Sequence, residues 1–571
     1  MQIGNPAARW IKRRILIPHV GWPYALALAK TCIEECVRDH PNCQAITPYT
    51  IGDAPLPTRL IDCSDPDRLR IVETNSSVRG TYIALSYVWG EDQPHRTTKE
   101  NLPSYKRRID PAELPQTILD AIHVTRALGI DLLWVDGLCI VQDSDQDMHH
   151  ELGRMRDVYR NAYVTIDAST AAKVSEGFLQ DRELRPMPDA VLPFICPRAG
   201  GPAEQSANGT QLGMVYVKLG FNDDNYCTFG EYERDDPDSY TALRGWCLQE
   251  RLLSTRLLIF NSETLRLRCH TTTHNIGGAD HNGRHDTTRI PDAVFHPDRL
   301  IARHSDKWQA IHRAWLKIVE EYTRANLSNP EDKLNAISAV AEMFAPFLGP
   351  EYVAGLWRSS LLDNLLWESD DEFPWRRPTE YRGPSWSWAS TDNPVSWGHY
   401  WKCDSLAEVV KCTVTLKNEK LPFGPVIGAS LILRSHIFPC KWLVDKDVGG
   451  PTPMRRLSTD FSLPAPFPLK SRIDELHDDS SVEPQLWFLP LLVGHPTFVI
   501  TQLHGLMVTR ADPDVWRRSG AQGRGDVYRR VCEKTFWIDW NTHPFEDVEG
   551  RDEIGSTRML AQIPKVDIEL V

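Results

Sequence analysis

One stretch of the chain, residues 114–170, constrains the fold more than any other. Apolar residues recur at helical spacing between Pro115 and Gly129, which predicts a helix that begins after the proline and ends at the glycine. The nearly unbroken apolar run 130–135 follows it. Such a run predicts a strand buried on both faces, as parallel strands usually are.

A second helix and a second strand repeat the alternation. Ser144 can cap the helix, and four apolar residues continue it at the spacing of one helix face: Met148, Leu152, Met155 and Tyr159. Residues 161–168 then predict a strand. With an earlier strand at 82–89, the pattern predicts an α/β domain: neighbouring strands of a largely parallel sheet flanked by helices, with ligands bound outside the carboxyl ends of the strands.

The length of the chain predicts further structural parts. At 571 residues it exceeds the size at which a single core usually stops growing. We predict a lead-in at 1–75, the α/β domain at 76–270, a helix-rich extension at 271–400 and a β-rich C-terminal domain at 401–571.

Two tryptophans in the sequence PSWSWAS carry a separate prediction. Residues two apart on a strand point to the same side. We therefore expect Trp386 and Trp388 to lie on one side of an extended segment, buried, and to seal the helical region against the α/β domain.

Composition excludes some partners. The net charge of −13 gives no general attraction to nucleic acid or to an anionic membrane surface, so neither is an expected partner. Thirteen scattered cysteines, odd in number, indicate free thiols and a reducing compartment, which favours the cytoplasm.

A group of metal-binding residue types lies near the N-terminus. Cys32, Cys36, His40 and Cys43 form a C-x3-C-x3-H-x2-C pattern. The pattern lacks the C-x2-C spacing typical of structural zinc sites, and no second pair follows it. We therefore expect no metal site in this chain.

Several sequence blocks carry a family resemblance. They are TYIALSYVWG at 81–90, LPQTILDAI at 114–122, LLWVDGLCIVQD at 132–143, MRDVYRNAYVTIDAS at 155–169 and RGWCLQERLLSTRLLIF at 244–260. In this order they resemble the fungal heterokaryon-incompatibility (HET) domain. The blocks AGLWRSSLLDNLLW at 354–367 and GPSWSWAS at 383–390 resemble those that follow the domain in many fungal members.

The resemblance implies a role in fungal non-self recognition and regulated cell death. It also implies a distant relation to Toll/interleukin-receptor (TIR) domains, some of which cleave NAD with a glutamate in a W-C-x-x-E-L context. Residues 148–152, MHHEL, share the Glu-Leu of that context and so point to Glu151, although Met148 and His149 replace the tryptophan and the cysteine. From the residues alone, Glu151 is instead a solvated side chain paired with Arg154.

The candidate site is acidic and aromatic. The chain contains no GxGxxG, GxxxxGK[ST], HExxH or GxSxG pattern. The candidate catalytic carboxylates are Asp136, Glu151 and Glu250, and the candidate substrate contacts are Tyr87, Trp89, Gly90, Gln142, Asp143, Trp246 and Arg251. Cleavage of the nicotinamide–ribose bond develops oxocarbenium character, which a carboxylate and a stacking aromatic ring would serve.

Three functions remain open at this point. The first is an enzyme that acts on NAD as a substrate, with no cofactor. The second is an interaction module without turnover, which binds other incompatibility or signalling proteins; homo-oligomerisation is open in both cases. The third is a HET protein repurposed to serve a specialised-metabolite cluster.

Overall fold

The computed structural model divides the chain into two compact units, residues 1–296 and 297–571. It describes residues 5–10, 16–46, 49, 52–74, 77–183, 190–196, 212–217, 239–278, 288–296, 301–369, 378, 380–398, 403–445, 454–459, 485–497, 500–511, 527–539 and 564–571. The domain limits predicted at residues 75, 270 and 400 stay predictions.

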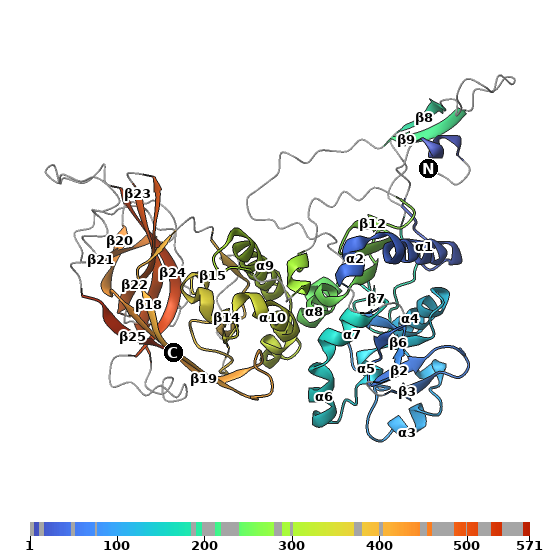
Figure 1. The fold of residues 1–571 in the computed structure, drawn as a ribbon, viewed down its shortest axis with the longest axis horizontal. Helices are drawn as coiled ribbons and strands as arrows, with labels where there is room; N and C mark the ends of the chain where they lie inside the picture. The colour runs from blue at the N-terminus through green and yellow to red at the C-terminus, as the bar shows by residue number, and fades with distance from the viewer. Residues whose placement is uncertain are drawn as a thin grey trace. The chain divides into compact units, whose positions relative to one another are not determined.

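A mixed eight-stranded sheet forms the centre of the first unit (Figure 1). In spatial order its strands are β12 (Thr273–Asn275), β11 (Leu265–Cys269), β10 (Arg256–Phe260), β7 (Val164–Asp167), β5 (Ile83–Ser86), β6 (Leu132–Trp134), β2 (Arg59–Asp62) and β3 (Arg70–Glu73). The four central strands, β10, β7, β5 and β6, pair in parallel. The outer pairs are antiparallel, so the prediction of a parallel sheet holds for the centre and not for the edges. The three strands predicted as neighbours, β5, β6 and β7, are neighbours.

Helices connect and surround these strands. They are α1 (Pro23–Asp39), α2 (Pro41–Ile46), α3 (Leu102–Tyr105), α4 (Gln116–Ala127), α5 (Asp136–Cys139), α6 (Asp145–Leu152), α7 (Met155–Asn161) and α8 (Gly245–Leu253). The predicted limits of α4 are confirmed: Pro115 is its N-cap, and Gly129 has a φ of +81° just after it. Two short pairs complete the unit, β1 (Ala54–Pro55) with β4 (Arg79–Gly80) and β8 (Ala190–Ile195) with β9 (Leu212–Val217).

The prediction of one continuous helix after Ser144 is wrong. The chain forms α6 and α7 with a break at Gly153 and Arg154. Glycine is a poor helix former, and the two helices bury different kinds of side chain. The buried residue of α6 is Glu151, whereas α7 buries Met155, Val158 and Tyr159.

The second unit combines helices with a large sheet. Its helices are α9 (Asp306–Thr323), α10 (Asn335–Leu348) and α11 (Leu361–Asn364), beside the strand pairs β13 (Tyr352–Val353) with β14 (Leu356–Trp357) and β15 (Trp367–Ser369) with β16 (Val395–Trp397). The nine-stranded sheet contains β17 (Asp404–Ser405), β18 (Glu408–Leu416), β19 (Val426–Ser435), β20 (Phe438–Asp445), β21 (Met454–Thr459), β22 (Leu486–Thr497), β23 (Ile500–Arg510), β24 (Val527–Asp539) and β25 (Val566–Leu570). Its order is β18-β19-β25-β24-β23-β22-β20-β21, and β17 pairs with β22.

Trp386 and Trp388 are both fully buried, as predicted. The predicted extended segment is wrong, because Trp388 begins a short 3-10 helix that the Ser387 hydroxyl caps by accepting a hydrogen bond from the Ala389 amide at 3.0 Å. The Trp388 indole donates to the carbonyl oxygen of Gly355 at 2.9 Å. The hydrogen bonds described for both residues are made within the second unit. That these tryptophans seal the helical region against the α/β domain stays a prediction.

No described helix combines the length and the apolar character that crossing a bilayer requires.

Gly90 follows β5 and supports a stability prediction. Its φ is +66°, and a Cβ atom there would lie 2.1 Å from the carbonyl oxygen of Ala172. Gly52 also has a positive φ, of +85°, but a Cβ atom on it would meet nothing within 4 Å. Gly52→Ala should therefore lower the free energy of unfolding only by the cost of a left-handed backbone, about 1–2 kcal/mol. Gly90→Ala should lower it by roughly 3 kcal/mol or more, because the added Cβ atom also clashes with Ala172.

Denaturant unfolding followed by circular dichroism measures both losses. Equal losses at the two positions would show that the approach of Ala172 to Gly90 does not constrain the fold.

Candidate functional site

The carboxyl ends of β5 and β6 bring several predicted residues together. Tyr87 and Trp89 follow β5, and Asp136 follows β6 as the first residue of α5. Glu250 arrives from α8, which packs against both β5 and α7. The edge predicted to bind ligands thus carries two carboxylates and two aromatic side chains.

Asp136 is held by donors from both neighbouring segments. Its Oδ2 accepts a hydrogen bond from the Trp89 indole nitrogen at 3.0 Å, and its Oδ1 accepts one from the Gly137 amide at 2.6 Å. Burial raises the pKa of Asp136, while hydrogen bonds from Tyr87, Gly137 and Trp89 and the charge of Arg244 oppose that rise. The carboxylate is therefore both desolvated and fixed in direction.

Glu250 is the most perturbed carboxylate of the site. Only 6% of the residue is exposed, and burial raises the pKa of Glu250 to about 8. The nearby charge of Asp136 adds to that rise, and the hydroxyls of Ser86 and Tyr159 oppose it. Within the described structure its Oε2 has no hydrogen-bond partner. At neutral pH Glu250 is thus mostly protonated, and its Oε2 is a buried polar atom of the kind that clusters at functional sites.

The positive charge of Arg244 acts on both carboxylates. Arg244 is half-buried at the N-cap of α8, and its charge opposes the rise that burial causes in the pKa of Asp136 and of Glu250. The site therefore combines a two-carboxylate centre with one nearby positive charge.

Glu151 belongs to a different cluster. It is 1% exposed, and its Oε1 lies 3.7 Å from the Arg59 guanidinium. The same guanidinium, which β2 supplies, also pairs with Asp147 and donates to the carbonyl oxygen of Cys139 at 2.6 Å. Neither oxygen of Glu151 has a hydrogen-bond partner in the described structure. The expected pairing of Glu151 with Arg154 is replaced by this contact with Arg59.

Gln142 and Asp143 support the chain beside the site. The Gln142 side-chain amide donates to the carbonyl oxygens of Asp136, at 3.0 Å, and of Ile140, at 3.2 Å. Asp143 accepts a hydrogen bond from the Lys99 amide at 2.8 Å. Both residues hold backbone in place, and their predicted substrate contacts stay predictions.

The remaining predicted contacts lie on α8 and after β5. Trp246 is half-buried, whereas Arg251 is only 8% exposed. Gly90 is exposed. The preceding residue, Trp89, accepts a hydrogen bond at its carbonyl oxygen from the Val174 amide at 3.0 Å. Trp246 and Gly90 thus offer accessible surface, and Arg251 offers little.

A cavity of about 280 Å³ lies under the loop that follows β5. Its described lining comprises Glu91, Asp92, Gln93, Pro94, His95, Glu113, Leu114, Pro115, Ile118, Leu138, Val174 and Ser175, and includes neither Asp136 nor Glu250. The buried Gln93 lines the cavity and also hydrogen-bonds the Tyr87 hydroxyl at 3.4 Å. Tyr87 in turn hydrogen-bonds Asp136, so these two side chains connect the cavity to the carboxylate pair.

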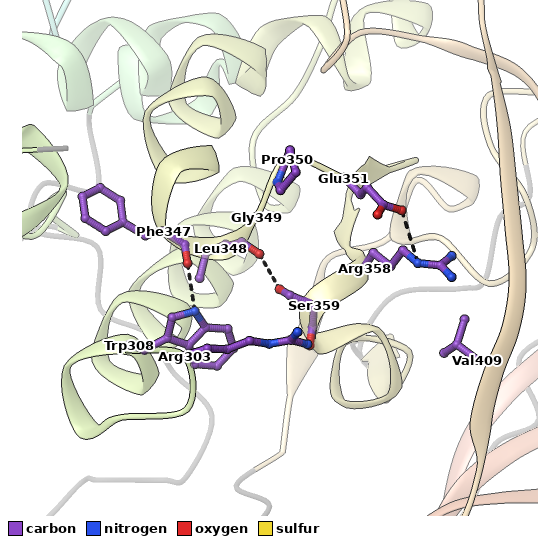
Figure 2. Close-up of a pocket in the computed structure, with 10 residues that line it drawn as sticks. All are labelled: Arg303, Trp308, Phe347, Leu348, Gly349, Pro350, Glu351, Arg358, Ser359 and Val409. Carbon is purple, nitrogen blue, oxygen red and sulfur yellow. Dashed lines mark hydrogen bonds and ion pairs between the residues drawn. The ribbon is translucent and has the colours of Figure 1, made fainter. Parts of the chain in front are cut away.

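A larger cavity, of about 400 Å³, lies in the second unit (Figure 2). Figure 2 shows that its polar groups bind one another: the Trp308 indole donates to the Phe347 carbonyl oxygen at 2.9 Å, and Arg358 pairs with Glu351 at 3.2 Å. Ser359 likewise binds the carbonyl oxygen of Leu348. Its polar side chains are thus largely paired, and it has no perturbed carboxylate pair, so its size alone does not make it the site.

Three residues of the two clusters were absent from the predicted set. Gln93 lies in a charged loop where nothing distinguishes one polar residue from another. The sequence predicts Tyr159 only as part of the apolar face of a helix. Arg59 stands directly before the apolar residues Leu60 and Ile61, and an arginine in a short buried strand needs a carboxylate partner.

Two comparisons with known proteins point to heterokaryon incompatibility proteins. The family model described as "Heterokaryon incompatibility protein (HET)" matches residues 82–250. "Heterokaryon incompatibility protein 6, OR allele" from Neurospora crassa is 32% identical over 93 residues, which are 15% of this chain and 14% of that protein. The chain thus matches only about a seventh of that relative's length. No solved structure matches the chain.

The raised pKa of Glu250 predicts a pH-dependent stability. The pKa of Glu250 is about 8 in the folded protein, and the ordinary pKa of a glutamate is 4.5. Between pH 4.5 and pH 8 the folded state therefore retains a proton that the unfolded chain releases. The free energy of unfolding should fall as pH rises from about 4.5 to about 8, by roughly 1.4 kcal/mol for each unit of pKa difference at most. Glu250→Gln should remove that part of the slope.

Thermal unfolding from pH 5 to pH 9 tests this difference. Glu100→Gln, at an exposed glutamate, is the matched control and should keep the wild-type slope. A Glu250→Gln slope equal to that of the wild type would mean that Glu250 ionises normally.

Proposed function

We propose that this chain, which carries a HET domain at residues 82–250, acts in fungal non-self recognition and regulated cell death by cleaving NAD at the Asp136–Glu250 pair. The observation that carries the enzymatic part is the desolvated pair of carboxylates at the carboxyl ends of parallel strands, with the pKa of each raised above its ordinary value. Carboxylates perturbed in this way cluster at functional sites.

In the proposed reaction the bond between ribose C1′ and the nicotinamide nitrogen breaks. Its electron pair leaves with nicotinamide, and a water oxygen forms the new bond to C1′. The negative charge of Asp136 stabilises the oxocarbenium-like transition state, and Asp136 takes the proton that the water loses. The hydrogen bonds from Trp89 and Gly137 support this role, because they favour the ionised form of Asp136.

Glu250 has the complementary role in the proposal. With a pKa of about 8 it is largely protonated at neutral pH and can donate a hydrogen bond to a ribose hydroxyl. Two carboxylates that perturb each other in this way divide into one charged and one neutral group, as acid and base pairs do in other enzymes.

The charges around the site favour one orientation of the substrate. Glu91, Asp92 and Glu113 line the adjoining cavity and would repel a pyrophosphate. Arg244 faces the carboxylate pair and would attract it. We therefore place the uncharged ring of nicotinamide toward the cavity and the pyrophosphate toward Arg244.

The resemblance to TIR domains favours Glu151 as the catalytic glutamate instead. In this chain Glu151 lies against Arg59, in the cluster that also holds Asp147. A shared guanidinium that holds two carboxylates of one helix serves to anchor α6. The proposal therefore assigns the reaction to Glu250 and an anchoring role to Glu151.

A second function, an interaction module without turnover, has its own support. The described lining of the adjoining cavity includes neither carboxylate. In this alternative the first unit binds other incompatibility or signalling proteins or a second copy of itself. We propose the cytoplasm as the location in both cases.

The enzymatic proposal predicts that the purified full chain releases nicotinamide from NAD. Asp136→Asn and Glu250→Leu should each lower the rate by about 100-fold or more, because the first removes the negative charge that stabilises the transition state and the second removes the hydrogen bond to the ribose hydroxyl. Glu151→Gln should stay within about tenfold of the wild type if that residue only anchors α6. Chromatographic detection of nicotinamide measures all three rates.

The control is Glu100→Gln, at an exposed glutamate outside the cavity lining, which should keep the wild-type rate. Loss of activity in Glu151→Gln with Glu250→Leu unaffected would move the catalytic role to Glu151. A chain that kills cells without releasing nicotinamide, and whose toxicity survives all three substitutions, would support the interaction module.

A further inference from the structure

Four side chains with metal-binding atoms meet at one edge of the first unit. They are Cys36, His40, Cys43 and Cys269, and their ligating atoms all lie within 4.8 Å of one another. Cys36 and Cys43 are fully buried, and Cys269 is 3% exposed. The cluster shares no residue with the carboxylate pair and takes no part in the proposed reaction.

The local fold explains why the first three residues converge. Cys36 lies in the last turn of α1, and His40 caps that helix with its amide bonded to the Cys36 carbonyl oxygen at 3.3 Å. Pro41 then starts α2, whose first turn presents Cys43. The turn between the two helices thus directs three ligating side chains to one point.

The fourth residue comes from the sheet. Cys269 is the last residue of β11, which packs against α1. Its Sγ lies 3.4 Å from Nδ1 of His40, and the Sγ of Cys43 lies 3.9 Å from the same nitrogen. In a tetrahedral zinc site with Zn–N and Zn–S bonds of about 2.0 and 2.3 Å, neighbouring nitrogen and sulfur ligands are about 3.6 Å apart.

We propose that Cys36, His40, Cys43 and Cys269 bind one structural zinc ion, which fastens the α1–α2 pair to β11. Three thiolates and one imidazole are a donor set that zinc favours, and four protein ligands leave no position for a substrate. The sequence prediction of no metal rested on the lack of a completing ligand, and Cys269, 226 residues after Cys43, supplies it.

The surroundings of the cluster suit a negatively charged centre. Three thiolates and a neutral imidazole around Zn²⁺ carry a net charge of −1. The Arg289 guanidinium donates to the carbonyl oxygen of Cys269, which places a positive charge beside the cluster. The Thr271 hydroxyl lies 3.3 Å from the Sγ of Cys43, so it can orient that ligand.

Metal analysis of the full chain, purified without chelator, tests the proposal. We expect about one zinc ion per chain, as a closed Cys₃His site holds. Cys269→Ser should lose most of the zinc, and Cys32→Ser is the matched control, because Cys32 lies on α1 one turn before Cys36 but outside the cluster. Cys32→Ser should keep the zinc content of the wild type.

A second measurement does not depend on the folding of a variant. Wild-type protein stripped with a chelator should unfold at a lower temperature and regain its midpoint on addition of zinc. Cobalt added in place of zinc should give the intense visible absorption of a tetrahedral thiolate site.

Three outcomes would overturn the proposal. One is a full chain that contains no stoichiometric zinc and takes up none. Another is mass spectrometry without reductant that finds a disulfide between any two of the three cysteines in freshly purified protein. The third is iron or copper in place of zinc.

Discussion

The parallel pairing of β5 between β6 and β7 is the constraint on which the rest of the first unit depends. Parallel strands end at the same edge of a sheet, so the residues that follow β5 and β6 must meet. Trp89 and Asp136 are 47 residues apart in the chain and join through one hydrogen bond there. The parallel direction of the strands, and not a sequence motif, therefore brings the residues of the candidate site together.

The central strands and α4 were predictable because their signals are local. A buried parallel strand is apolar throughout, and a helix between a proline and a glycine has its limits in the sequence. The break at Gly153 was not predictable from the apolar stripe. Apolar periodicity predicts which residues share a helix face. It does not predict that Glu151 pairs with Arg59 while Tyr159 packs in the core.

Some residues of the candidate site are likewise predictable from local sequence, and others are not. Asp136, Tyr87 and Trp89 could be predicted, because each lies at or just after the carboxyl end of a predicted strand, although β5 ends at Ser86 and not at Trp89. The roles of Gln93, Arg59 and Cys269 could not, because each depends on a partner brought near by the fold from a distant segment. Glu250 stood among the candidates, but its raised pKa comes from burial beside Asp136, which only the folded chain supplies.

The order of strands in the sheet also bears on where this domain begins and ends. The matched family region, residues 82–250, contains only β5, β6, β7 and the short strands β8 and β9. In the folded chain β2 covers the outer side of β6, and β10 covers the outer side of β7. A fragment cut at 82 and 250 would therefore leave two apolar strands with unpaired backbone edges, which are templates for aggregation. By the same argument the sheet is complete only from β2 at Arg59 to β12 at Asn275, because β11 pairs with the outer side of β10 and β12 with that of β11, so the folding unit extends beyond the stretch that sequence similarity outlines.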